Sequence, residues 1–173
     1  CSSALRRSPG VDSFMPPLSW AMPEADALAM EWLDHWVHTA PVRVALVQPC
    51  PGAAAGRAPV RRITWRELDD EVRRMAAHLR SLGLPPGSSI AILSKNCAHW
   101  MLADLAIWRA GHVSVPLYPT LAADSVRQIL EHSGARLLFA GKLDDWPAMK
   151  PGVPVGLPCI GFPYGSTPEL EGW

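Results

Sequence analysis

The feature that most constrains the fold is a strand–helix unit that recurs between residues 90 and 140. Short apolar strands are predicted at Ile90–Leu93, Val113–Leu117 and Leu137–Ala140, so their first residues are 23 and 24 positions apart. Helical patterns fill the intervals at about 97–110 and 122–133. Strands without polar alternation, separated by helices, indicate parallel pairing with both faces covered. With right-handed crossovers, the prediction is an α/β fold with a doubly wound, mostly parallel sheet and flanking helices.

A second helix pattern precedes this unit and has clear ends. Thr64 and Glu67 form a capping box, and Gly83 supplies a left-handed stop. We expect Asp69 and Arg73 to pair on its solvated face, as we do Asp70 and Arg74. Apolar residues recur at steps of three and four and predict a buried face: Trp65, Leu68, Val72, Met75, Leu79 and Leu82.

The N-terminal third has weaker patterns. Residues 1–23 mix Ser, Pro, Gly and Arg without periodicity and are predicted to be loose. A helix is predicted from Glu24 to Pro41, with Leu28, Trp32, Leu33, Trp36 and Val37 on one face. Strands at Val42–Val47 and Val60–Thr64 follow, and a hairpin between them is one reading.

The sequence therefore predicts an α/β subdomain over residues 24–141, followed by a tail over 142–173. The tail contains six prolines and five glycines, with one strand expected at Leu157–Phe162. A compact domain rarely ends in so long an irregular segment, so we interpret the tail as the approach to further domains. The first residue is Cys1 rather than Met, which agrees with an excerpt of a longer protein.

Charge and composition exclude several classes of function. Sixteen basic and 16 acidic residues balance, which gives no electrostatic argument for binding nucleic acid or an anionic membrane surface. No apolar run approaches the roughly 18 residues of a membrane-spanning helix. The four cysteines are far apart and follow no secretory leader, so reduced thiols and a cytoplasmic location are expected.

Motifs for catalysis and metal binding are missing from the sequence. It has no phosphate-binding G-x-x-x-x-G-K-[ST] or G-x-G-x-x-G loop, no G-x-S-x-G elbow and no H-E-x-x-H. Lys95 is predicted to be a solvated loop residue, and the Asp144–Asp145 pair has no basic partner nearby in sequence and is also predicted to be solvated. We therefore predict no catalytic, cofactor-binding or metal-binding residue in this chain.

The histidines favour structural roles. Glu31, His35 and His38 form an incomplete metal-ligand set, so a surface role is preferred. His112 is expected to be a neutral, hydrogen-bonded packing residue, and His132 suits a helix C-terminus.

Four segments in this order resemble the N-terminal subdomain of adenylate-forming, AMP-binding enzymes. They are "VRVALVQP", "ITWRELDDEVRRMAAHLRSLGLPPGSSIAILSKN", "HWMLADLAIWRAGHVSVPLYPT" and "ILEHSGARLLF". Within that superfamily the chain is most similar to long-chain fatty-acid–CoA ligases (acyl-CoA synthetases). The resemblance covers about residues 28–141 and departs from the family pattern at Lys95, His99 and His112.

The resemblance implies a two-step reaction for a full-length enzyme. A carboxylate and ATP would give an acyl-adenylate in the presence of Mg²⁺, and coenzyme A would then form the thioester. The Ser/Thr/Gly-rich phosphate loop of the family is missing from this chain, so the chain is expected to need no cofactor and to be inactive alone. Its expected partner is the remainder of the ligase, with its central and C-terminal domains, and a fatty acid is the expected substrate of the full enzyme.

Ligands of α/β sheets bind beyond the carboxyl ends of the strands. Tyr118 and Thr120 are therefore the candidate substrate-adjacent residues. The full enzyme is expected to be cytoplasmic, with peripheral membrane association left open. Two alternatives remain for the chain: a stand-alone, non-catalytic interaction or regulatory module, and an unrelated nucleotide-binding domain. An exposed apolar flank is also expected where the rest of an enzyme would dock.

Overall fold

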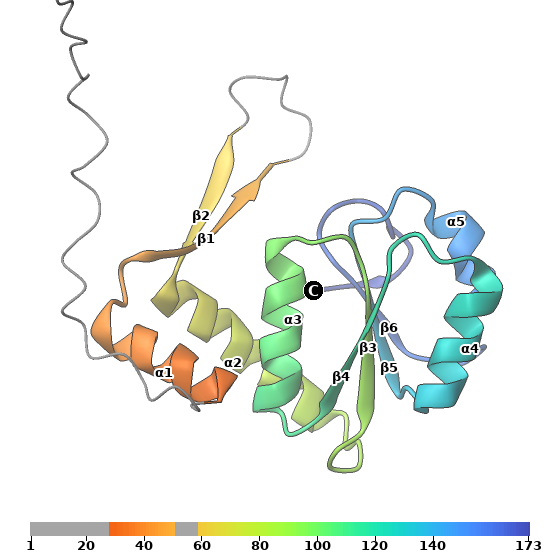
Figure 1. Cartoon of the computed structure of the whole chain (residues 1–173), viewed down its shortest axis with the longest axis horizontal. Helices are drawn as coiled ribbons and strands as arrows, with labels where there is room; N and C mark the ends of the chain where they lie inside the picture. Colours follow the sequence, from red (N-terminus) through yellow and green to blue (C-terminus); the bar gives the residue numbers. More distant parts are fainter. Residues whose placement is uncertain (1–27, 51–58) are drawn as a thin grey trace, which may run out of the picture.

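Residues 28–50 and 59–173 are described by the structure, a computed structural model. A helix and a two-stranded hairpin lie at one end of the molecule, and a sheet with helices on both faces forms the rest (Figure 1). The segment predicted to be loose, residues 1–23, lies outside the described residues. Glu24, the predicted start of the first helix, does so too.

Five parallel strands form the main sheet in the order β4-β3-β5-β6-β7, which confirms the predicted α/β fold. The three predicted strands are all present, with one extra residue at the start of the first. The strands are β3 (Ser89–Leu93), β4 (Val113–Leu117), β5 (Leu137–Ala140), β6 (Cys159–Gly161) and β7 (Glu171–Gly172).

Helices cover both faces of the sheet (Figure 1). On one face lie α2 (Trp65–Ser81) and α3 (Ala98–Arg109), and on the other lie α4 (Ala123–Ser133) and the short α5 (Trp146–Met149). Along β3, Ile90 and Ile92 belong to the first buried cluster, whereas Ala91 and Leu93 belong to the second. A strand between two helix layers has no solvent-facing side, which explains why its sequence has no polar alternation.

The ends of α2 follow from its sequence. The Glu67 amide donates to Thr64 Oγ1 at 3.3 Å, and the Thr64 amide donates to Glu67 Oε2 at 2.8 Å, so the predicted capping box is confirmed. Gly83, just past the helix, has a φ of 65° and is the left-handed residue that was expected.

The N-terminal part contains α1 (Ala29–Thr39) and an antiparallel hairpin of β1 (Val44–Pro49) and β2 (Val60–Thr64). The predicted hairpin between these two strands is therefore confirmed, and β2 begins and ends at the predicted residues. The strand predicted at Val42–Val47 lies two residues later, because the turn after α1 extends to Arg43.

Three burial predictions on α1 and α2 are wrong. Leu28 and Leu82 were placed on buried faces but are 72% and 42% exposed. They are cap residues of α1 and α2, so the periodicity of the helix no longer directs their side chains inward. Asp69 was placed on the solvated face but is only 4% exposed.

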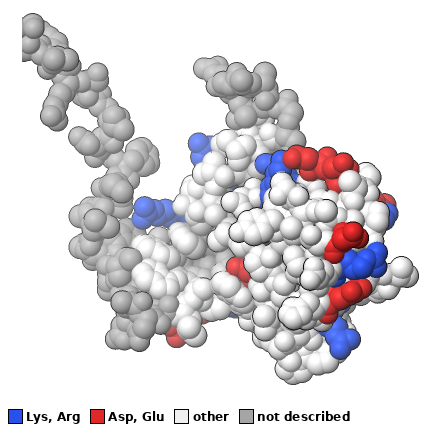
Figure 2. Space-filling view, turned by 45° about the vertical axis from the view of Figure 1, so that its right-hand side comes forward, with Lys and Arg blue, Asp and Glu red and all other residues white. Residues whose placement is uncertain are grey.

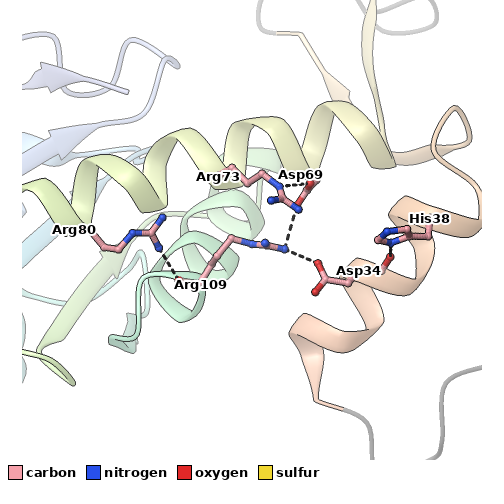
Figure 3. A network of polar contacts seen from close by, with 6 residues as sticks. All are labelled: Asp34, His38, Asp69, Arg73, Arg80 and Arg109. Carbon is pink, nitrogen blue, oxygen red and sulfur yellow. Dashed lines mark hydrogen bonds and ion pairs between the residues drawn. The ribbon is translucent and has the colours of Figure 1, made fainter.

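Asp69 is buried because an ion-pair network joins three helices around it (Figure 3). Its Oδ2 accepts a hydrogen bond from Arg73 Nε at 2.5 Å, which confirms the predicted pair. Arg109 of α3 lies 3.1 Å from Asp69 Oδ1 of α2 and donates to Asp34 Oδ1 of α1 at 2.8 Å. Arg80 of α2 donates to the Arg109 carbonyl at 3.0 Å. These contacts fix α1 against the α2–α3 pair.

Residues 142–173 do not form the irregular tail that was predicted. They contain α5, a 3₁₀ turn at Lys150–Gly152, and strands β6 and β7. The strand expected at Leu157–Phe162 is present as β6, which pairs in parallel with β5. The sheet therefore continues past the predicted boundary at residue 141. Strands of two and three residues carry little pattern of their own, and pairing defines their bounds: β6 pairs with β5, and β7 pairs with β6.

Charged side chains of both signs are interspersed on the face drawn in Figure 2, with no large patch of a single sign. None of the helices within residues 28–50 and 59–173 combines the length and apolar character that crossing a bilayer requires.

Candidate functional site

The loops that follow β3 and β4 separate at the carboxyl edge of the sheet. The chain leaves β3 toward α3 on one face, whereas it leaves β4 toward α4 on the opposite face. The two strands are neighbours, and ligands of open α/β sheets bind outside the carboxyl ends of the strands.

A hollow of about 260 Å³ lies at the carboxyl ends of β3 and β4. The turn after β3 contributes Ser94 and Asn96, and the β4 loop contributes Tyr118 and Pro119. Trp100 of α3 forms a further wall. We call this the β3–β4 hollow.

Of the two predicted site residues, one lines the hollow and the other does not. Tyr118 lines the β3–β4 hollow and is 78% exposed, so its ring and hydroxyl are available to a ligand. Thr120, two residues on, is exposed but is not among the residues that line the hollow.

Lys95 has an acidic partner that lies 49 residues away in sequence. Its Nζ lies 2.6 and 2.5 Å from the two carboxylate oxygens of Asp144. The exposure of these side chains agrees with the prediction that Lys95 and the Asp144–Asp145 pair are solvated, and the structure adds their partners: Asp144 pairs with Lys95, and Asp145 accepts a hydrogen bond from the Ala148 amide at the start of α5. The ion pair is largely exposed, so it contributes at most about 1 kcal/mol, but it joins the loops after β3 and β5.

Gly141 lets these two loops approach each other closely. A Cβ at this position would lie 2.1 Å from Phe162 Cδ2 and 2.8 Å from Ser94 Oγ. Both distances are below any tolerable contact, so only glycine fits beside the turn that carries Ser94 and Asn96.

The histidines outside this edge show no catalytic or metal-binding arrangement. His38 Nδ1 lies 2.7 Å from the Asp34 carbonyl oxygen. His132 lies in the last turn of α4, as predicted. His112 is buried as expected, but its Nδ1 has no hydrogen-bond partner, which corrects the expectation of a hydrogen-bonded ring.

Neither a metal centre nor a disulfide is found in the part of the chain that the structure describes. No group of three or more His, Cys, Asp or Glu side chains within residues 28–50 and 59–173 could hold a metal ion. Cys50, Cys97 and Cys159 are free, and each is half-buried rather than fully buried.

A second hollow, of about 440 Å³, was not foreseen from the sequence. It is lined by residues from β2, α2, α3 and the segment after β6, among them Arg61, Arg74, His99 and Trp173. We call it the α2–α3 cavity. Its residues are up to 112 positions apart (173 minus 61), and no local motif links them, so only the fold brings them together.

The side chains that line the β3–β4 hollow suit ligand binding rather than bond cleavage. The hollow has a serine hydroxyl, an amide and a phenol for hydrogen bonds and a tryptophan for apolar contact. No histidine, carboxylate or cysteine that could act as a general base or nucleophile is among its lining residues.

Comparison with known proteins identifies the family. The AMP-binding enzyme family matches residues 33–157. Phosphinothricin tripeptide synthetase PhsC of Streptomyces viridochromogenes is 34% identical over 149 residues, covering 70% of this chain and 14% of that protein. The 3-[(3aS,4S,7aS)-7a-methyl-1,5-dioxo-octahydro-1H-inden-4-yl]propanoyl:CoA ligase of Mycobacterium tuberculosis is 43% identical over 98 residues, covering 57% and 19%. Long-chain-fatty-acid–CoA ligase FadD15 of Mycobacterium bovis is 38% identical over 78 residues, covering 45% and 13%. The chain thus spans less than a fifth of each relative's length.

Solved structures agree with this result. Klebsiella oxytoca NpsA in complex with 3-hydroxyanthranilyl-AMSN superposes with a TM-score of 0.57 at 27% identity, covering 75% of this chain and 23% of that one. CmiS6 superposes with a TM-score of 0.63 at 23% identity, covering 81% and 33%, and shows the shared fold. These matches rule out the alternative of an unrelated nucleotide-binding domain. The chain belongs to the AMP-binding enzyme family and has the fold of the N-terminal subdomain of adenylate-forming enzymes.

Proposed function

We propose that this chain is the N-terminal part of an ATP-dependent fatty-acid–CoA ligase and is inactive alone. In the first step a carboxylate oxygen attacks the α-phosphorus of ATP, and the bond to pyrophosphate breaks to leave an acyl-adenylate. In the second step the sulfur of coenzyme A attacks the acyl carbon, and AMP leaves as the thioester forms. Two relatives that are named as CoA ligases, at 43% and 38% identity, support this reaction class.

The observation that carries the proposal is the β3–β4 hollow, whose lining residues offer groups for ligand contact but no phosphate cradle. The turn after β3 is Ser94-Lys95-Asn96, which has no glycine, and the Lys95 ammonium is engaged by Asp144. The described residues also do not fit a Mg²⁺ site, because no cluster of three suitable ligands exists among them. We therefore assign ATP, Mg²⁺ and coenzyme A to the remainder of the ligase.

Within such an enzyme this chain would supply the scaffold and one wall of the substrate cleft. Tyr118 lines the hollow, and Thr120 lies two residues beyond it, so both remain the proposed substrate-adjacent residues. We propose a cytoplasmic enzyme, with membrane contact, where present, limited to peripheral association. The lack of a membrane-spanning helix among the described residues is compatible with this.

The direct test is to express the chain together with the reading frame that follows it in its gene. Acid-dependent exchange between pyrophosphate and ATP reports adenylate formation, and mass spectrometry reports the CoA thioester. We expect both with fatty acids. The 173-residue chain alone, as the control, should release no pyrophosphate and should show no saturable calorimetric binding of ATP, AMP or FMN. Turnover by the chain alone would contradict the division of roles proposed here.

A second candidate is adenylation of an amino acid, as part of a peptide synthetase. The observation that favours it is the match to the tripeptide synthetase PhsC, which covers 70% of this chain. The same assay separates the two candidates, since amino-acid-dependent exchange without a CoA thioester would support the second. If the folded protein shows no exchange with any acid tested, both candidates are contradicted and the non-catalytic module is supported.

A further inference from the structure

We propose that the α2–α3 cavity binds a small planar anion that carries a hydrogen-bond donor, of the class of hydroxy-substituted aromatic carboxylates. The cavity lies between α2, the first turn of α3 and the segment after β6. Its volume of about 440 Å³ is within the range of small-molecule sites. This inference does not rest on the proposed ligase function.

His99, which lines the cavity, belongs to a hydrogen-bond chain whose directions can be assigned. Gln48 Oε1 accepts from the Ala98 amide at 2.7 Å and from the Tyr164 hydroxyl at 3.2 Å. Gln48 Nε2 donates to the Pro49 carbonyl at 2.8 Å, so the orientation of this amide is fixed. Because the single hydroxyl proton of Tyr164 goes to Gln48, the Tyr164 oxygen is left as an acceptor.

His99 completes the chain and presents its other nitrogen as an acceptor. Its Nδ1 lies 2.8 Å from the Tyr164 oxygen, so Nδ1 carries the proton of that hydrogen bond. Burial lowers the pKa of His99, so its ring is neutral at pH 7 and Nε2 holds a lone pair. No hydrogen bond to Nε2 comes from the described parts of the chain, and His99 lines the cavity. A donor group on a ligand would satisfy this nitrogen.

The rim of the cavity supplies a cation for the anionic group. Arg61, Glu71 and Arg74 all line the cavity, and the charges of Arg61 and Glu71 are paired with each other, which leaves Arg74 as the cation. Arg74 makes no ion pair with any residue in the described ranges, and its side chain is exposed. A guanidinium in this state binds a carboxylate through two parallel hydrogen bonds.

The walls favour a flat ring between these two polar groups. Trp173 and Met75 line the cavity together with Pro163. The Trp173 ring packs edge-on against His99, with centroids 5.4 Å apart and planes at 87°. An aromatic ring placed here would contact these walls while its carboxylate meets Arg74 and its hydroxyl meets His99.

The test is titration of the full 173-residue chain with 3- and 4-hydroxybenzoate, followed by calorimetry and by ¹⁵N spectra of the histidine rings. Two control ligands are titrated in the same way: benzoate, which lacks the hydroxyl donor, and phenol, which lacks the carboxylate. We expect saturable binding of at least one hydroxybenzoate, at least tenfold tighter than benzoate or phenol. The spectra should show His99 protonated at Nδ1, with Nε2 shifting on binding.

Matched variants separate the cavity from non-specific binding. Arg74→Gln should weaken hydroxybenzoate binding about tenfold, whereas Arg66→Gln, on the same helix but outside the cavity, should leave it unchanged. Tyr164→Phe removes the acceptor that holds the proton on Nδ1, so it should abolish the preference for hydroxybenzoate over benzoate. If Tyr164→Phe fails to fold, the comparison of Arg74→Gln with Arg66→Gln and the His99 spectra still test the proposal.

Four results would overturn the proposal. They are no saturable hydroxybenzoate binding up to about 10 mM, equal affinity for benzoate, an Arg74→Gln variant with unchanged affinity, and a His99 ring protonated at Nε2 in the ligand-free chain.

Discussion

Asp69 illustrates how a single buried carboxylate can organise three helices. It is only 4% exposed, yet its charge is compensated by Arg73 of its own helix and by Arg109 of α3. Arg109 in turn reaches Asp34 of α1, so one guanidinium links all three helices. A buried charge is costly when a partner is removed, and the partners here differ in exposure.

Arg109→Gln is expected to lower the free energy of unfolding by about 1–3 kcal/mol, since Asp69 would keep only Arg73. Arg73→Gln is the matched control and should cost less, because Arg73 is 57% exposed and water can replace it. Urea unfolding of the two variants measures the difference. An equal or larger loss in Arg73→Gln would contradict the central position of Arg109.

Gly141 gives a second prediction for a single residue. Gly141→Ala should destabilise the chain by at least about 2 kcal/mol, because its Cβ would overlap the Phe162 ring. Gly172→Ala is the control, since nothing lies within 4 Å of a Cβ built there. Thermal unfolding should therefore distinguish the two alanine variants, and similar melting temperatures would show that Phe162 can move aside without cost.

Among the helices and strands, the sequence predicted those elements whose position is determined by residues close together in the chain. The capping box fixed α2, and apolar runs identified β3, β4 and β5. The short strands β6 and β7 were missed or only partly predicted, because pairing with a neighbouring strand, rather than their own sequence, defines them.

The candidate site was predicted only in part, for the same reason. Tyr118 follows directly from the rule for strand carboxyl ends. The Lys95–Asp144 pair spans 49 positions and the His99–Tyr164 contact spans 65. No spacing in a single sequence encodes such contacts, so they become visible only once the sheet order is known.

The segment between β6 and β7 is connected to α5 by Glu169, which gives a pH prediction. Glu169 Oε1 accepts from Trp146 Nε1 at 2.6 Å and from Lys150 Nζ at 3.0 Å, and these contacts lower the pKa of Glu169 from 4.5 to about 2. The folded chain therefore keeps this carboxylate ionised below pH 4.5, where the unfolded chain binds a proton. The stability that Glu169 contributes is fully present above pH 4.5 and is lost as the pH falls toward 2.

Glu169→Gln should therefore lower the urea midpoint at pH 6, and the difference from the parent chain should shrink as the pH falls toward 2. Glu131→Gln, on the exposed side of α4, is the control for the loss of one carboxylate at pH 6 and should change the urea midpoint there less than Glu169→Gln. A ¹³C titration of the Glu169 carboxyl with its midpoint near 4.5 would contradict the proposed contacts.

The whole molecule carries the apolar flank that was expected from the sequence. A hollow of about 370 Å³ is bounded by α1, β1, α2 and α3. Its walls are almost entirely apolar, with Trp36 and Trp65 stacked at 6.0 Å. Met101, also in this wall, is 42% exposed. Apolar patches of this kind mark surfaces that associate with other protein.

Met101→Lys is expected to reduce self-association of the chain, because it places a charge on the apolar flank without disturbing the sheet. Val155→Lys replaces a fully exposed apolar residue outside the flank and should change little. Light scattering over a range of concentrations measures both. An equal reduction in the two variants would point to net charge rather than to the flank.

The strand order described for the sheet has a consequence for synthesis on the ribosome. The first strand of the sheet to be made, β3, pairs with both β4 and β5, which are the next two. Then β6 adds to β5, and β7 adds to β6. Every new strand thus finds its partner already made, so the sheet can grow outward as the chain emerges at roughly 5–20 residues per second. Only β3 has to wait for its first neighbour to be translated, and each later strand finds one already made.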